Sequence, residues 1–373
     1  IKRNNISSDQ LMSLALDAAT VGANSYCEII LALPSDSKAA HMRTIRTVID
    51  SGFTNIYLFQ LMLLPGTDMC TPNSKERYGM ILRYRVLPRC YGYFNLLGER
   101  VVAAEIEEIC VGNDTLSFED YLQCRRLHLI ITIFYNDGLF QTLLVALRRW
   151  SISPFEWMEM IYDTEMRDGL GQVFKSFEQA TKDELWEQRE NLAEVIQESG
   201  NVKEFISGEL GNNLLFVHKT QAIIEHAHEL ASLARRTALC LLEQHEKLDD
   251  TAREFFNECV DYHLLRQTKI FEGRNEEVIG RFAFDIHRFE EDPDPGEPES
   301  YRFQEPKDIR FILDDSQRDL VNRYVDIYGD DVVGIGRILS KVYVKKLFRH
   351  PIVEDESVTP ESTIKMHIAG LQN

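Results

Sequence analysis

Two short apolar runs, separated by one helical pattern, constrain the fold of this chain more than any other feature of its sequence. Residues 27–33 (CEIILAL) and 55–63 (NIYLFQLML) have strand length and are almost entirely apolar, which is typical of parallel strands with both faces covered. Between them Ser37 is suited to cap a helix over residues 38–51, and Gly52 to end it. Because the runs begin about 30 residues apart, the length of a βαβ unit, the pattern predicts parallel strands.

Each run leads into a loop that contains proline, LPSDS at residues 33–37 and LPGTD at residues 64–68. In parallel α/β sheets and barrels, ligands bind at the carboxyl ends of the strands, where these loops lie. Proline and glycine that only terminate a strand would explain either loop equally well. Glu28 is the most informative polar residue nearby, because a charged side chain in an apolar strand is costly unless it is paired, bound to a ligand or facing solvent.

Length and charge exclude several classes of protein. A chain of 373 residues is long enough for two or three domains, and no apolar run approaches the ~20 residues of a membrane span. The net charge of −19 argues against a nucleic-acid partner, because phosphate binding needs clustered lysine and arginine. Seven dispersed cysteines predict a reducing cytoplasm rather than a disulfide scaffold. The charged opening IKRNNISSD, with no signal peptide, is expected of a chain that begins within a longer protein.

The rest of the chain divides by composition into four segments that follow the strand-bearing residues 1–70. Residues 71–116 are rich in aromatics and arginine and predict a loop and strand excursion over the mouth of a barrel. Residues 117–288 have helical periodicity almost throughout. The acidic, proline-rich residues 289–300 predict a linker or an exposed loop, and residues 301–373 predict a small α/β tail.

Local motifs for the commonest chemistries do not occur in the sequence. It contains no G-x-S-x-G, P-loop or dinucleotide-binding glycine fingerprint, and its cysteines never fall in CxxC or CxxxCxxC spacing. His226 and His228 are two positions apart, and on a helix that spacing points the two rings in nearly opposite directions, so they cannot share a metal. No catalytic residue and no metal ligand is therefore predicted.

Several longer motifs together resemble a known family. The segments IKRNNIS (1–7), SYCEIILALPSDSKAAH (25–41) and IYLFQLMLLPGTDM (56–69), followed by ERYGM (76–80) and RYRVLPRCYG (83–92), resemble the later barrel strands of radical S-adenosylmethionine enzymes that carry a cobalamin-binding domain. The resemblance covers roughly residues 1–92 and implies the C-terminal portion of a partial (β/α)6 TIM-like barrel, with residues 25–34 in the fifth strand and 60–66 in the sixth, followed by a mainly α-helical domain.

The resemblance also implies the chemistry of the whole enzyme. In this family a CxxxCxxC loop holds a [4Fe–4S] cluster that cleaves S-adenosylmethionine to a 5′-deoxyadenosyl radical or passes electrons to methylcobalamin. This chain has no such loop, so the cluster ligands would lie upstream, the missing N-terminal half of the barrel would be its partner, and the chain alone would be inactive. The substrate and the choice between methyl transfer, rearrangement and ring closure are left open.

Carried over residue by residue, the resemblance implies two groups of site residues. Those expected to contact S-adenosylmethionine are Ser25, Glu28, Leu33, Pro34, Gln60, Leu64, Pro65 and Gly66, and those near the barrel mouth, facing an anionic substrate, are Arg83, Arg85 and Arg89. Ordinary salt bridges in a chain with 60 acidic residues would explain the arginines equally well.

Two other functions fit the same sequence. The half-barrel could be a non-catalytic remnant whose helical domain is a protein-interaction module. Alternatively, the chain could belong to an α/β-barrel enzyme without iron, which would need catalytic carboxylates at more strand ends than the sequence offers. A half-barrel also exposes sheet edges, so the isolated chain is expected to be unstable or to aggregate.

Overall fold

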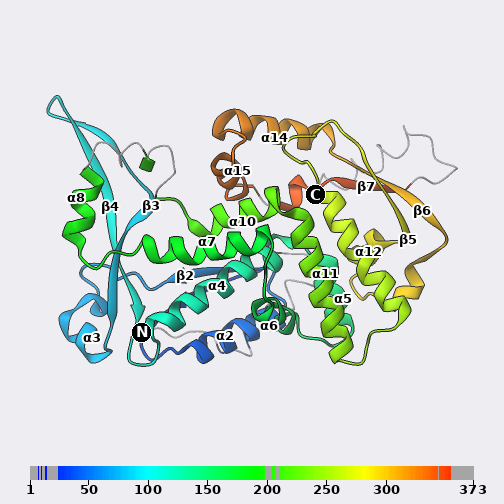
Figure 1. Ribbon diagram of the computed structural model, residues 1–373, viewed down its shortest axis with the longest axis horizontal. Coiled ribbons are helices and arrows are strands. Elements are labelled where there is room, and N and C mark those ends of the chain that lie inside the picture. Colours follow the sequence, from blue (N-terminus) through cyan, green and yellow to red (C-terminus); the bar gives the residue numbers. More distant parts are fainter. Residues whose placement is uncertain are drawn as a thin grey trace.

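The predicted βαβ unit is present at the start of the described chain. A computed structural model describes residues 24–197, 211–342 and 344–353, together with the single residues 7, 10, 13, 14, 204 and 205, and it combines helices with small sheets. Strands β1 (Tyr26–Leu31) and β2 (Asn55–Gln60) pair in parallel, and α2 (Lys38–Asp50) connects them (Figure 1). Ser37 caps α2 by accepting a hydrogen bond of 3.2 Å from the amide of Ala40.

The two faces of this sheet differ, although both were expected to be covered. Ile29, Leu31, Ile56 and Leu58 are buried on the face that packs against α2 and the helical body. On the opposite face Tyr26 and Tyr57 are 66% and 47% exposed, and Ile30 and Phe59 are 39% and 48% exposed. The run is apolar on both sides, as a doubly covered strand should be. Within the described residues, however, no element covers this second face.

The edge of β2 away from β1 is closed by a side chain instead of a strand. Asn136 accepts a hydrogen bond of 2.9 Å from the Ile56 amide and donates one of 2.9 Å to the Ile56 carbonyl, so its amide group replaces the peptide of a neighbouring strand. Asn55 accepts from the backbone amide of Asp137 at 3.0 Å. Beyond β2, the Met62–Ile109 bridge pairs the chain with β4.

The arginine-rich segment forms a long antiparallel hairpin. After η1 (Asp68–Cys70) and the short helix α3 (Pro72–Arg77), β3 (Ile81–Leu96) pairs with β4 (Glu99–Gly112). The base of the hairpin lies against the strand ends, and its tip projects away from the body (Figure 1). The segment VVAAEIEEICV (residues 101–111) belongs to strand β4.

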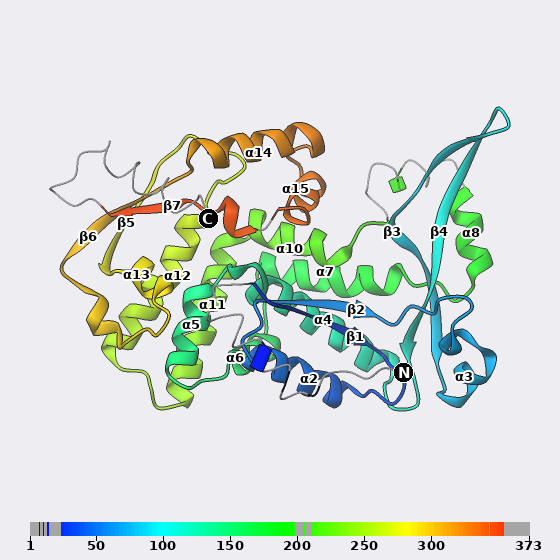
Figure 2. The same ribbon diagram turned by 180° about the vertical axis from the view of Figure 1, so that it is seen from behind.

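A helical body follows, and α4 runs through it (Figures 1 and 2). Its last long helix ends at Gln267, and strand β5 (Val278–Phe284) occupies part of the residues 117–288 that were predicted to be helical. Ser117 and Asp120 form a capping box at the start of α4. Most side chains of α4 are buried, because the helix contacts β2, β4 and four other helices. The helices of this body are α4 (Phe118–Phe134), α5 (Gln141–Arg149), α6 (Pro154–Asp163), α7 (Gly169–Asp183), α8 (Arg189–Gln197), α10 (Leu214–Glu225), α11 (Ala227–Gln244) and α12 (Asp250–Gln267), with η2 (Asn136–Gly138) after α4.

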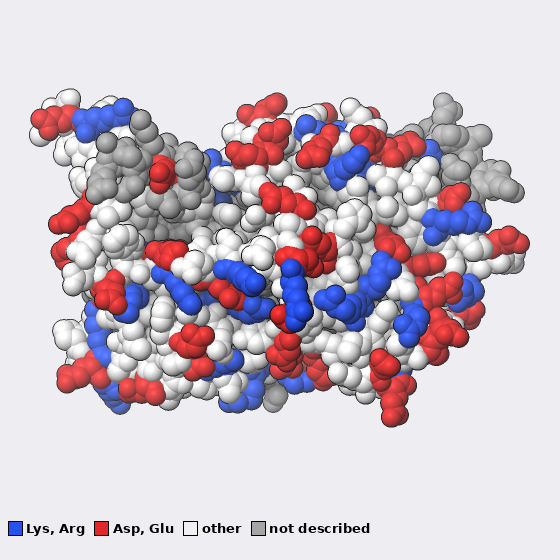
Figure 3. All heavy atoms as spheres, in the orientation of Figure 1, with Lys and Arg blue, Asp and Glu red and all other residues white. Residues whose placement is uncertain are grey.

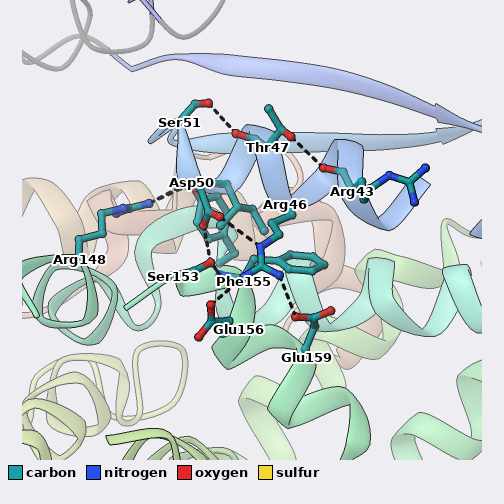
Figure 4. A network of polar contacts seen from close by, with 12 residues as sticks. Arg43, Arg46, Thr47, Asp50, Ser51, Arg148, Ser153, Phe155, Glu156 and Glu159 are labelled. Carbon is teal, nitrogen blue, oxygen red and sulfur yellow. Dashed lines mark hydrogen bonds and ion pairs between the residues drawn. The ribbon is translucent and has the colours of Figure 1, made fainter. Parts of the chain in front are cut away.

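Helix α2 is joined to α6 by the polar contacts drawn in Figure 4. Arg46 pairs with Glu156 at 2.7 Å, and Ser153 donates a hydrogen bond of 2.6 Å to Asp50. The Arg46 guanidinium also lies 5.8 Å from the centre of the Phe155 ring. The βαβ unit and the helical body are therefore held together by polar contacts as well as by a shared apolar core.

The acidic segment predicted as a linker lies within one folded unit. Strand β5 (Val278–Phe284) comes before it and β6 (Arg302–Ile312) after it, and the two pair in a sheet that β7 (His350–Val353) completes. Within the segment, Phe289 is fully buried and packs 5.2 Å from the ring of Tyr301. These two aromatic anchors hold an otherwise acidic stretch against the core.

Short helices connect and flank the strands of this C-terminal region. They are α13 (Ile286–Glu291), η3 (Pro298–Tyr301), α14 (Asp315–Tyr328), α15 (Val332–Leu339) and η4 (Val344–Leu347). They support the mixed helix and strand content expected of the tail, whose residues 354–373 lie outside the described part.

Among the described residues, no single helix combines the length and apolar character needed to cross a membrane. The consecutive helical segments Phe118–Gly138 and Gln141–Arg149 satisfy the criterion only as a pair, and they are bent by 90° relative to each other.

Replacing Asn136 by alanine tests the role of its amide at the sheet edge. Asn136→Ala leaves the buried amide and carbonyl of Ile56 without their partner, so we expect the free energy of unfolding in urea to fall by about 2–3 kcal/mol. Asn95→Ala, in the exposed tip of β3, is the matched control and should change it by less than about 0.5 kcal/mol. Equal effects of the two substitutions would contradict a structural role for Asn136.

Candidate functional site

A cavity of about 600 Å³ lies beside β2, between the βαβ unit and the helical body. Its walls come from all of β2, the middle and end of α4, the start of α10, parts of β3 and β4, and residues 339–342 after α15. Elements far apart in sequence thus form one cavity, lined by both polar and apolar side chains, next to the strand that was predicted to border the cofactor. Cavities of this size hold small organic ligands.

The predicted cofactor residues lie along the βαβ unit at different ends and faces. Glu28 pairs in register with Tyr57 and points to the open face of the sheet, whereas Gln60 pairs with Leu31 and belongs to the covered face. Gln60 lines the cavity. Ser25 precedes β1, at the amino end of the strand, and exchanges hydrogen bonds with Thr54. Ser25 is therefore at the end of the strand opposite the LPSDS loop.

The two strand-end loops meet at the same edge of the sheet. The segments 31–33 and 61–63 pack in one apolar cluster with β4, and Asn113 donates a hydrogen bond of 3.0 Å to the carbonyl of Leu33. Pro34 follows in the same loop, partly buried. In the second loop Leu64, Pro65 and Gly66 are exposed, and Gly66 has a φ of +85°, which favours glycine.

Only one of the three predicted substrate arginines lines the cavity. Arg85 is largely buried there and pairs with Glu107 and, at 2.8 Å, with Glu184. Burial opposes its charge, but Glu184 and Glu107 raise the pKa of Arg85 above its ordinary value. Arg83 pairs with exposed Glu187 at 3.1 Å, and Arg89 lies near Ser340, with 3.4 Å between Nη1 and Oγ. Salt bridges therefore account for two of these arginines.

Charges of opposite sign are mixed on the molecular surface as well. Basic and acidic side chains alternate over the face shown in Figure 3, and no extended patch of one sign is visible on it.

Sequence reasoning missed a second arginine in the cavity wall, Arg125 on α4. It is 3% exposed, and its Nε has no hydrogen-bond partner among the described residues. Burial lowers the pKa of Arg125, and Tyr121 and Glu184 oppose that effect only in part. The available signal was its spacing: Arg125 lies four residues from both Tyr121 and Leu129 on the apolar face of α4, whereas Arg126 points to Glu178.

A buried histidine pair connects Arg125 to the loop after β1. The two Nε2 atoms of His41 and His128 are 2.9 Å apart, His128 Nδ1 is 3.5 Å from Arg125 Nη1, and His41 Nδ1 is 3.5 Å from Asp36 Oδ2. Arginine only donates hydrogen bonds, so His128 Nδ1 accepts, and its Nε2–H donates to His41. His41 then carries its proton on Nδ1, toward Asp36. A series of polar contacts thus runs from the cavity wall to the LPSDS loop.

The histidines considered from the sequence do not form a metal site. His226 lies at the break between α10 and α11 and pairs with Glu229 at 3.0 Å, while His228 is exposed. In the described parts of the chain no three histidine, cysteine or carboxylate side chains come together in a geometry that could hold a metal ion.

The histidine pair makes stability depend on pH. Burial, His41 and Arg125 lower the pKa of His128 well below its ordinary value, so His128 is neutral in the folded chain while the unfolded chain binds a proton below about pH 6.5. Stability is therefore lost as pH falls below that value, and at pH 5 the loss from His128 is about 2 kcal/mol.

Substitution of His128 by glutamine checks this pH dependence. We expect the decrease in the free energy of unfolding between pH 7 and pH 5 to be smaller by about 2 kcal/mol in His128→Gln than in the unaltered chain. His228→Gln, which alters an exposed histidine, should leave the decrease unchanged. A pH dependence that is identical in all three proteins would show that His128 is protonated in the folded state.

Comparison of the sequence with protein-family models and with curated proteins finds no match.

Proposed function

We propose that this chain forms the last two strands of a partial parallel barrel and the helical domain after it, in a radical S-adenosylmethionine enzyme of the cobalamin-binding class. The observation that carries the proposal is the asymmetry of the β1–β2 sheet, which is closed at β2 and open at β1.

The closed edge agrees with β2 being the last strand of such a barrel. The Asn136 amide occupies the hydrogen-bonding groups of Ile56, and the chain beyond β2 pairs with β4. Within the described residues β1 pairs with β2 alone, so further parallel strands would add at β1. This order matches the resemblance, in which these strands are the fifth and sixth.

The open face agrees with an inward, barrel-lining surface. In a (β/α) barrel the helices cover the outside and side chains from the strands fill the inside. Here α2 covers one face, and Tyr26, Ile30, Tyr57 and Phe59 lie exposed on the other. Glu28 is the acidic residue of the strands on this face, where it would accept hydrogen bonds from the ribose or the methionine amine of the cofactor.

In this proposal, residues of this chain hold S-adenosylmethionine, whereas the iron–sulfur cluster is held elsewhere. A [4Fe–4S] cluster, bound through cysteines outside this sequence, would supply the electron that cleaves S-adenosylmethionine. The backbone of Leu33, Pro34 and the Leu64–Gly66 turn would contact the adenine, since both loops lie at the carboxyl edge of the sheet. The apolar cluster beneath them would keep water from that edge.

The test uses the complete reading frame that contains this chain. After anaerobic reconstitution with iron and sulfide, we expect dithionite-dependent release of 5′-deoxyadenosine or S-adenosylhomocysteine and absorbance near ~400 nm from the cluster. Absence of both products, in a frame without a cysteine triplet, would leave the alternative of a non-catalytic half-barrel whose helical domain binds a protein.

Glu28→Gln in the same protein tests the residue-level claim. Loss of a charge-assisted hydrogen bond should weaken binding of S-adenosylmethionine by about tenfold or more, without loss of the cluster absorbance. Glu99→Gln, at the exposed hairpin tip, is the control and should bind as the unaltered enzyme does. Equal affinity of all three would remove Glu28 from the site.

A further inference from the structure

We propose that the cavity beside β2 binds a small ligand through an oxyanion, a carboxylate or a phosphate group, which the Arg125 guanidinium recognises at the first turn of α10. This proposal rests on the cavity alone and does not depend on the radical chemistry proposed above.

Arg125 differs from the other buried arginines in having no carboxylate or carbonyl partner. Arg85 pairs with two carboxylates, and Arg349, fully buried, donates to four backbone carbonyls, those of Thr268, Lys269, Gly273 and Glu276. Arg125 is equally enclosed, yet no described carboxylate lies within 4.0 Å of it, and its one polar contact is the 3.5 Å approach to His128. A buried cation without an anion is costly, and arginine stays charged. An anionic ligand would satisfy it.

The histidine pair holds this guanidinium in place. His128 Nδ1 accepts from Nη1, and the ring of Phe177 lies 5.5 Å from the guanidinium carbon. His128 is in turn fixed by His41 at 2.9 Å. Because His128 engages only Nη1, the guanidinium retains N–H donors that a carboxylate or phosphate in the cavity would accept from.

The start of α10 lies in the same wall. Residues 212–216 line the cavity, and the helix of 12 residues begins there, with Asn213 as its N-cap. The amino end of a helix carries a partial positive charge that favours anions. A helix end alone would not define a site, but here it lies in the same cavity as a buried, unpaired guanidinium.

The remaining charges of the lining leave an excess of positive charge. Glu107 is engaged by Arg85, and Asp137 is paired with the buried ammonium of Lys219. Lys341 lines the cavity and is exposed, and no carboxylate partner is found for it in the described chain. The cations Arg85, Arg125, Lys219 and Lys341 therefore outnumber the carboxylates Glu107, Glu184 and Asp137 by one, in a protein whose net charge is −19.

Thermal unfolding of the full chain with inorganic phosphate or malonate, at ionic strength held constant with chloride, tests the proposal. We expect a saturable rise of several °C in melting temperature with at least one of the two anions, and the anion that binds more tightly identifies the oxyanion. Arg125→Met should abolish the saturable rise, and its melting temperature without anion should equal or exceed that of the unaltered chain, because an unpaired buried charge is removed. Arg126→Gln, on the next residue of α4 and outside the lining, should keep the anion response.

A second variant distinguishes loss of anion binding from misfolding of Arg125→Met. Arg125→Lys keeps the charge but loses the planar fork, so its anion affinity, measured by titration calorimetry, should fall about tenfold. The proposal is overturned if the unaltered chain shows no saturable response, if the response rises linearly with salt, or if Arg125→Met or Arg125→Lys binds the anion as tightly as the unaltered chain does.

Discussion

Burial of α4 on nearly every side is the constraint on which the rest of the structure depends. The helix contacts β2 and β4 at the edge of the sheet and α2, α6, α7 and α10 in the helical body, so it forms the shared core of both parts. A helix enclosed in this way has no water to solvate its polar side chains, and each of them needs a partner inside the protein. His128 and, just past the end of the helix, Asn136 meet that requirement, whereas Arg125 has only the 3.5 Å contact with His128.

Patterns of apolar residues and helix caps in the sequence predicted the parts of the fold that depend on neighbouring residues. The apolar runs and the Ser37 cap correctly gave the βαβ unit, since strand length, capping and spacing are local properties. The open face of the sheet was not predictable, because an apolar strand has the same sequence whether or not another element covers it. The composition of residues 289–300 predicted a linker or an exposed loop, and most of these residues are exposed or partly exposed, but composition did not reveal that Phe289 and, just after the segment, Tyr301 are buried.

The candidate site was predicted less completely than the fold. Arg85 was identified from a basic cluster. Its two carboxylate partners lie 22 and 99 residues away in sequence, so the sequence did not show that Arg85 forms salt bridges with them. Arg125 was overlooked among the charges of a long helix. Polar contacts run from Arg125 through the histidine pair to Asp36, so they join the cavity to the loop at the end of β1, the two regions singled out by structure and by sequence.

The closure of β2 by Asn136 has a consequence for protein synthesis. The two hydrogen-bonded residues are separated by 80 positions, so the ribosome adds Ile56 about 4–16 s before it adds Asn136 at 5–20 residues per second. During that interval the edge of β2 has no partner, and its exposed amide and carbonyl groups can pair with another nascent chain. The strand edge that Asn136 protects in the folded protein is therefore unprotected by it for several seconds while the protein is being made.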